Sequence, residues 1–346
     1  MNKIYINSIK QISAQHPLVE DWFEYPVYNS EPYVRAVEPD FKQFFTPTEA
    51  RRLGKILKRA LLVSRLAMQE SGISSPDAII TGTGLGCIES TEIFLDKLVR
   101  DGEEFLNPTH FMQSTHNTIG SLIAIDVKCN SYNNTFSHKG ISFECALQDA
   151  FLQMKQVDKL RNVKNVLVGA HDEMTPAYFT LLKKAGYVGN PNQIFACETS
   201  VAMMLSTEKT EKNWCEIEEI EKIYCDMRCA TSAMRQISNR ISHISNPDYI
   251  MIGTNGNSKN DNIYFENCAK LFPNIPLLHY KPIFGESYTA PALGVYAAAT
   301  CLKLGKVPSH LRCEISVGKH EPNNVNKILC YNHFENKNHT FILLSR

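Results

Sequence analysis

The sequence predicts an α/β fold in which a mainly parallel sheet is covered by helices on both faces. Two observations carry this prediction: short apolar runs alternate with amphipathic stretches along the 346 residues, and glycine-rich turns separate the two kinds of segment. A third is that residues 77–86 and 248–261 look alike, because each apolar run leads into a glycine-rich turn that begins G-T. This likeness suggests an internal duplication, although the matching segments are too short to establish one.

Local patterns predict the individual elements in order. Before about residue 50 the chain is rich in aromatic residues and proline, so we expect irregular structure there. Helical periodicity begins after Thr46, which forms a capping-box pattern with Glu49. Residues 77–86 are expected to form a buried strand and a tight turn that lead into an amphipathic helix. Further strands are expected within 162–173, from Ser200 onward, within 248–261 and, as a pair joined by a polar turn, within 327–346.

Composition and charge exclude several classes of protein. The chain has 36 basic and 36 acidic side chains, so it lacks the net positive charge with which proteins attract nucleic acid or anionic membranes. No run approaches the roughly 20 apolar residues that span a bilayer. The N-terminal segment has charges where a signal peptide needs an unbroken apolar core. We therefore expect a cytoplasmic protein with no nucleic-acid partner and no membrane insertion.

The eleven cysteines stand singly inside apolar stretches, with no CxxC and no Cys/His cluster at zinc spacing. Cys225 and Cys229 form the closest approach to such a pair, and they lack further ligands nearby in the sequence. Because cysteine in a reducing compartment behaves as a small hydrophobic residue, we expect buried free thiols. We expect no metal site.

Glycines at 82, 84 and 86 invite comparison with a dinucleotide-binding turn. The fingerprint G-x-G-x-x-G places its third glycine one residue later than this sequence does. A phosphate-binding G-x-x-x-x-G-K-[ST] pattern is missing as well. These glycines are therefore interpreted as permitting a sharp turn between a strand and a helix, and no cofactor is expected.

Seven segments, taken in order along the chain, resemble motifs of the β-ketoacyl synthase family of the thiolase superfamily. This resemblance implies a thiolase-like fold of two pseudo-symmetric halves, layered as helices, sheet, helices, sheet and helices. It also divides the chain into an N-terminal half, 1–210, which carries the nucleophile turn, and a C-terminal half, 211–346. The matching segments are 81–86, 117–120, 135–140, 168–174, 197–208, 253–257 and 281–287.

Departures from the family pattern carry the functional argument. Ser137 stands where the resemblance places the nucleophilic cysteine, and a hydroxyl is a poor nucleophile unless a base takes its proton. Asn255 replaces the first family histidine, and its amide can still donate a hydrogen bond. Glu286 replaces the second histidine, and its negative charge opposes the enolate that forms when a malonyl thioester loses carbon dioxide. The active-site positions are therefore expected to be degenerate.

Lys281 is kept from the family pattern, and we expect it to form a structural ion pair with Glu286, five residues on across a glycine turn. The family also has a glycine-rich segment that gates the acyl pocket. Here this gate segment, residues 332–338, contains no glycine, so its backbone has fewer accessible states and gating at each turnover is not expected.

Three side chains, those of Ser137, His116 and His138, can be interpreted as either catalytic or structural. Ser137 can instead cap the helix expected to begin near Ile141. His116 lies in a segment that the resemblance places near a subunit interface, and His138 follows the nucleophile position. Either histidine could act as a general base, but a structural role is favoured for both.

The resemblance therefore implies a largely non-catalytic chain-length-factor subunit. Such a subunit pairs with an active ketosynthase, meets an acyl carrier protein and shapes the acyl tunnel in polyketide, aryl-polyene or fatty-acid-like biosynthesis. The sequence around 116–120 and 284–287 is most similar to the aryl-polyene (flexirubin-type) versions. An enzyme of another class, in which Glu286 or a histidine activates Ser137 for acyl transfer or hydrolysis, is the alternative. A homodimeric binding protein is a third possibility.

Overall fold

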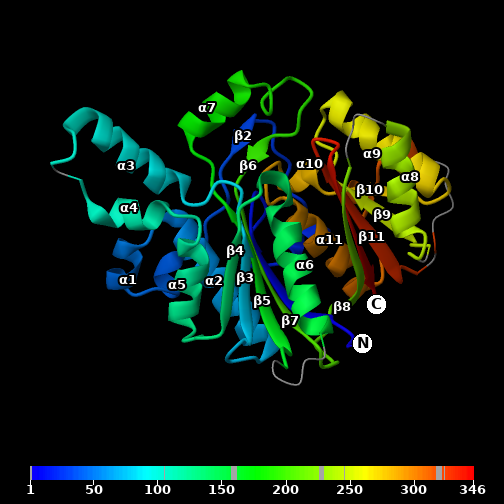
Figure 1. The fold of residues 1–346 in the computed structure, drawn as a ribbon, viewed down its shortest axis with the longest axis horizontal. Coiled ribbons are helices and arrows are strands. Elements are labelled where there is room, and N and C mark those ends of the chain that lie inside the picture. Colours follow the sequence, from blue (N-terminus) through cyan, green and yellow to red (C-terminus); the bar gives the residue numbers. More distant parts are fainter. Residues whose placement is uncertain are drawn as a thin grey trace.

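A mixed sheet of ten strands runs through the described part of the chain (Figure 1). The structure is a computed structural model that describes residues 2–104, 106–156, 162–225, 230–244, 246–316, 322 and 324–346. The strands lie in the order β10-β9-β11-β12-β8-β1-β7-β5-β3-β4, and β2 and β6 form a separate pair. Their bounds are β1 Tyr5–Ile12, β2 Tyr33–Val34, β3 Ala78–Gly82, β4 Tyr132–Phe136, β5 Asn165–Asp172, β6 Ala196–Cys197, β7 Thr199–Ser206, β8 Cys215–Tyr224, β9 Tyr249–Ile252, β10 Leu277–His279, β11 Lys327–Phe334 and β12 Asn338–Ser345.

The order of the strands repeats. Numbered along the chain, the first half contributes β1, β3, β4, β5 and β7, and the second contributes β8 to β12. In each half the spatial order is third, second, fourth, fifth and first, and the fifth strand is antiparallel to both of its neighbours. The two segments that looked alike in the sequence become β3 and β9, the second strand of each half, so the suggested duplication is confirmed. The junction proposed at 210/211 falls between β7 and β8, and the division into domains there remains a proposal.

The sheet differs from the expectation in one respect, because it is mixed rather than mainly parallel. A three-residue turn, Glu335 to Lys337, joins β11 to β12, and so short a connection permits only antiparallel pairing. The two halves also meet edge to edge, since Tyr5 and Ile6 of β1 pair with Glu216 and Cys215 of β8.

Helices cover the sheet in the expected layers. α6 and α11 pack between the two halves of the sheet, α2 and α5 cover the outer face of the first half, and α8 and α9 cover that of the second. α3 and α4 pack on each other and project at the left edge of Figure 1. Helix bounds are α1 Pro47–Arg52, α2 Lys55–Ser71, α3 Ile88–Asp101, α4 Pro108–Ser114, α5 Thr118–Asp126, α6 Ser142–Lys155, α7 Pro176–Lys184, α8 Ala230–Ile241, α9 Ser258–Leu271, α10 Lys281–Phe284 and α11 Pro291–Leu304.

The N-terminal segment is more regular than its composition predicts. The capping box is confirmed: the backbone N–H of Thr46 donates to Glu49 Oε2 at 2.9 Å, and the N–H of Glu49 donates to Thr46 Oγ1 at 3.3 Å. The expectation of irregular structure before residue 50 is wrong, because β1 is a central strand. Its buried polar residues obscured the pattern, and they are satisfied inside the fold; Ser8 Oγ, for example, donates to the Ala67 carbonyl at 2.6 Å.

The glycine turn after β3 is held by a carboxylate. Asp172 Oδ1 accepts hydrogen bonds from the N–H groups of Gly84 and Leu85, both at 2.9 Å, and from the Thr83 hydroxyl at 3.0 Å. A side chain at Gly82 would meet the backbone of Ser142 at 2.5 Å. The structural interpretation of these glycines is therefore confirmed. The N–H groups of Gly84 and Leu85, which a phosphate-binding turn would direct at its ligand, donate to Asp172 instead.

Ten of the eleven cysteines are buried and form no disulfide, as expected, and Cys229 lies outside the described residues. Among the described helices, none combines the length and the apolarity needed to cross a bilayer.

Candidate functional site

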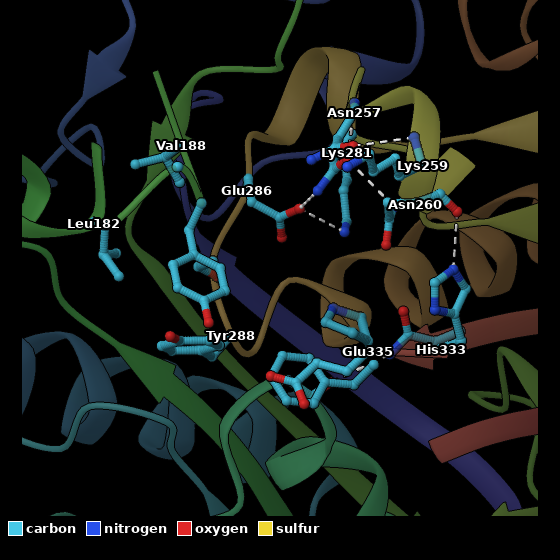
Figure 2. Close-up of a pocket in the computed structure, with 18 of the residues that line it drawn as sticks. Leu182, Val188, Asn257, Lys259, Asn260, Lys281, Glu286, Tyr288, His333 and Glu335 are labelled. Carbon is cyan, nitrogen blue, oxygen red and sulfur yellow. Dashed lines mark hydrogen bonds and ion pairs between the residues drawn. The ribbon is translucent and has the colours of Figure 1, made fainter. Parts of the chain in front are cut away.

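A cavity of about 400 Å³ opens where the carboxyl ends of strands from the second half face α7 and the nucleophile turn (Figure 2). Its walls come from the loop and first turn of α9 after β9, from residues 281–291, from the β11–β12 turn and from the end of α7. Binding sites in open α/β sheets lie at this end of the strands. Of the sequence-predicted site residues, Asn255, Lys281 and Glu286 line the cavity and Ser137 does not.

The expected ion pair is confirmed and includes a third residue. Glu286 Oε2 accepts from Lys281 Nζ at 2.9 Å and from Asn255 Nδ2 at 2.8 Å. The Lys281 side chain is 7% exposed and that of Glu286 is 18% exposed, so the pair is shielded from solvent. Figure 2 shows dashed lines from one oxygen of the Glu286 carboxylate to these two partners.

The amide of Asn255 has a fixed orientation. Its Oδ1 accepts from the N–H of Asn257 at 3.1 Å and from Asn260 Nδ2 at 3.2 Å, which leaves Nδ2 as the group that faces Glu286. The loop itself is held by Asp261, whose two carboxylate oxygens accept the N–H groups of Asn255 and Gly256, both at 2.9 Å. One N–H of the amide group that could serve a substrate oxygen is therefore already engaged by Glu286.

Gly285 makes the approach of Glu286 possible. Its φ is +83°, and a side chain there would meet Cys197 Cβ at 2.5 Å. This close approach allows Glu286 to pair through its backbone with the strand that contains Phe195 and Cys197, with N–H to carbonyl distances of 2.9 Å in both directions. The carboxylate is thus anchored by main-chain bonds on either side of it.

Ser137 stands on the exposed surface after β4. Neither of the two roles expected for it is observed. The turn is instead held by Ser142, whose Oγ accepts the N–H of His138 at 2.7 Å and donates to the Lys139 carbonyl at 2.8 Å. α6 begins at Ser142 with Ile141 at the N-cap and no side-chain cap, so the prediction that Ser137 caps this helix is wrong.

Phe334 of the gate segment packs on the nucleophile turn where Gly140 of that turn meets the cavity. A Cβ placed on Gly140 would lie 2.4 Å from the Phe334 ring, so the ring rests directly on this glycine. Ser137 Oγ makes no hydrogen bond to Glu286 or to a histidine in the described part of the chain. The geometry therefore does not assemble a serine nucleophile with a base.

The two histidines that the sequence offered as general bases do not lie at the cavity. His116 and His138 are both exposed, and neither lines the cavity. His333, which sequence reasoning did not single out, does line it. Burial lowers the pKa of His333 to about 3, so the ring is neutral, and its Nε2 pairs with the Asn260 carbonyl at 3.0 Å. Its Nδ1 accepts the N–H of Asn336 at 3.4 Å, which leaves no free ring nitrogen for a substrate.

Glu144 is a buried acid that the sequence did not identify. It is fully buried in the first turn of α6, and Asn332 Nδ2 donates to its Oε1. Burial raises the pKa of the Glu144 carboxyl to about 7, an effect that the bond from Asn332 and the positive charge of Lys281 partly offset. Only tertiary contacts identify this residue, because nothing in the local sequence distinguishes it from a solvated helix-terminal acid.

Replacing Lys281 with Met is expected to destabilise the protein by about 3 kcal/mol, because it leaves the shielded Glu286 carboxylate without its cation. The double variant K281M/E286Q removes both charges and keeps an oxygen that accepts from Asn255, so it should regain at least half of the loss. Urea denaturation measures both values. Equal losses in the single and the double variant would contradict the interpretation of Lys281 and Glu286 as a charge pair.

The raised pKa of Glu144 predicts how stability depends on pH. Between pH 4.5 and 7 the folded chain holds a proton on this group that the unfolded chain has released, so its contribution to stability falls as the pH rises through that window. Glu144→Gln removes this dependence. The stability of E144Q relative to the parent should therefore increase by roughly 3 kcal/mol between pH 4.5 and 8 in denaturation curves. The exposed Glu208→Gln is the control, and a flat difference for E144Q would refute the assignment.

Comparisons with known proteins agree with this architecture. A family model described as the β-ketoacyl synthase N-terminal domain matches residues 28–252, which is more than half of the chain. The sequence matches no curated protein.

Solved structures share the fold along its whole length. The ishigamide ketosynthase/chain length factor matches with a TM-score of 0.78 and 13% identity over 99% of both chains. The ketosynthase ApeO in complex with its chain length factor ApeC from Xenorhabdus doucetiae matches at 0.77 and 13%, over 99% of this chain and 98% of that one. A β-ketoacyl synthase from Burkholderia phymatum STM815 matches at 0.76 and 12% over 100% of both. With the family model covering β3, the nucleophile turn and the strands up to β9, the chain belongs to the β-ketoacyl synthase family.

Proposed function

We propose that this chain is a largely non-catalytic, chain-length-factor-like subunit that pairs with an active ketosynthase in the cytoplasm and shapes its acyl tunnel. The observation that carries the proposal is the closed arrangement at the degenerate site. One carboxylate, Glu286, takes the hydrogen bonds of both Lys281 and Asn255.

Condensation needs the opposite electrostatics. Loss of carbon dioxide from an extender thioester leaves negative charge on an enolate oxygen, which neutral or cationic donors must stabilise. Here the two donors are engaged by an acid anchored through its main chain, and Ser137 stands outside the cavity. A site of this kind cannot stabilise a second negative charge without first breaking its own ion pair.

Two surfaces support pairing with another subunit. β4 is an edge strand whose outer side has no partner strand in the described chain, and such an edge can pair with a strand of another chain. On the same half of the chain, α3 and α4 expose apolar side chains. These are Ile93, Leu95, Val99, Phe111 and Met112.

The similar structures support the identity of the partner. Two of them are described as a ketosynthase with its chain length factor, and a third, which matches at a TM-score of 0.78 and 12% identity, is described as an acyl carrier protein in complex with its ketosynthase. We extend both partners to this chain, namely a Cys-containing ketosynthase and an acyl carrier protein. No observation favours the alternative, an acyltransferase or hydrolase that uses Ser137.

The catalytic prediction is tested on the purified chain, alone and with a Cys-His-His ketosynthase from the same genome. Alone, it should release no carbon dioxide from a malonyl carrier protein and should gain no acyl group in intact-mass spectra. Together, the two should form one complex of the summed mass that elongates the acyl chain. Replacing the partner's cysteine should abolish elongation, whereas Ser137→Ala in this chain should not change it. An acylated Ser137, or decarboxylation by the chain alone, would overturn the proposal.

The interface prediction uses two equally exposed apolar residues. Phe111 on α4 is 56% exposed and Leu181 on α7 is 60% exposed. Phe111→Glu places a charge in the proposed interface and should weaken the complex at least tenfold in light-scattering or calorimetric titrations. Leu181→Glu carries the same change on another surface and should bind like the parent. A homodimer of this chain that persists in the presence of the ketosynthase would favour the homodimeric binding protein instead.

A further inference from the structure

The gate segment forms a tight β-hairpin rather than a loop. Phe334 pairs with Asn338, and the N–H of Lys337 donates to the Phe334 carbonyl at 3.1 Å. The turn between them has three residues, of which Glu335 and Asn336 both have φ of 53°, in the left-handed region. This turn positions Phe334 on Gly140 and forms one wall of the cavity.

Asn332 connects this hairpin to two other elements. Its Nδ2 donates to the Gly140 carbonyl at 3.2 Å and to Glu144 Oε1, and its Oδ1 accepts from the hydroxyl of Tyr264 at 2.8 Å. One side chain of β11 thus bridges the nucleophile turn, the first turn of α6 and helix α9. Asn332 lies two residues before Phe334, so holding Asn332 also holds the ring that covers Gly140.

Glu144 is the buried acid of this bridge. Its side chain is fully buried, and its Oε2 is buried with no hydrogen-bond partner. Burying a carboxyl group with an unpaired oxygen lowers the free energy of unfolding. The hydrogen bond made by its other oxygen is then needed to offset part of this cost. The hydrogen bond that it accepts from another element is the one from Asn332.

We infer that Glu144 is a positioning residue that acts through Asn332 to fix the β11–β12 hairpin against the nucleophile turn, and so holds this wall of the cavity in a single position. The inference goes beyond the proposed function and does not depend on it, because every contact lies within one chain. The gate segment contains no glycine, so its backbone has few accessible conformations. The hydrogen bonds of Asn332 additionally hold it against the nucleophile turn.

Hydrogen–deuterium exchange of the full chain tests this inference through three amides. The N–H of His333 donates to the Tyr264 hydroxyl, that of Asn336 to His333 Nδ1 and that of Lys337 to the Phe334 carbonyl. Glu144→Leu removes the acceptor, so these amides should exchange about tenfold faster, as expected for the loss of one buried hydrogen bond. Glu144→Gln keeps an oxygen for Asn332 and should stay within about threefold of the parent.

Glu173→Leu is the matched control, because Glu173 is another buried acid that accepts one hydrogen bond, from the N–H of Glu89 at 3.0 Å, and its recorded contacts do not include the hairpin. Its hairpin amides should exchange at the parental rate. Equal acceleration in E173L and E144L would mean general destabilisation and would overturn the inference. If E144L fails to fold, Asn332→Ala tests the other half of the bridge, and parental exchange in N332A would also overturn it.

Discussion

The enclosure of two helices between two halves of one sheet is the constraint on which the rest of this structure depends. α6 and α11 are covered on both sides. Residues 291–302 of α11 are all buried, which explains why this helix has mostly apolar and small side chains on every face. Packing both halves around these helices brings strand ends from distant parts of the chain together. The cavity exists because of that meeting: Gly140 belongs to the first half, and Asn255, Lys281 and Glu286 belong to the second.

At that meeting point, stability and chemistry make opposite demands. A shielded lysine needs an anion close by, and Glu286 supplies it at 2.9 Å. The same carboxylate also accepts a hydrogen bond from the amide of Asn255, so the fold gains a polar cluster in which both donor groups of the site already face an anion. Glu286 therefore both fixes the positions of Lys281 and Asn255 and places a negative charge where condensation would need neutral or cationic donors. The second polar cluster, around Glu144 and Asn332, also joins separate elements of the fold to each other.

Sequence reasoning succeeded where the deciding contacts are local. The capping box at Thr46 and the pairing of Lys281 with Glu286 each join residues within one turn, so spacing predicts them. It failed where distant contacts decide. β1 was missed because it contains polar residues such as Ser8. The burial of Ser8 is compensated by its hydrogen bond to the carbonyl of Ala67, on a helix 59 residues away in sequence. Ser137 was placed at the site by analogy, whereas the actual turn is set by Ser142 and covered by Phe334.

The sequence by itself determined the alternation of strands and helices, the likeness of the two segments that become β3 and β9, the family resemblance, and the presence of Ser137, Asn255 and Glu286 in segments that resemble family motifs, because each of these is written in residue type and short spacing. Only the tertiary structure decided which donors are already engaged, where Ser137 lies relative to the cavity, and that Glu144 is buried beside Asn332. Those features depend on contacts between distant residues, such as Glu144 and Asn332, which are 188 positions apart. Burial and hydrogen-bond saturation follow from that long-range packing, which local sequence does not encode.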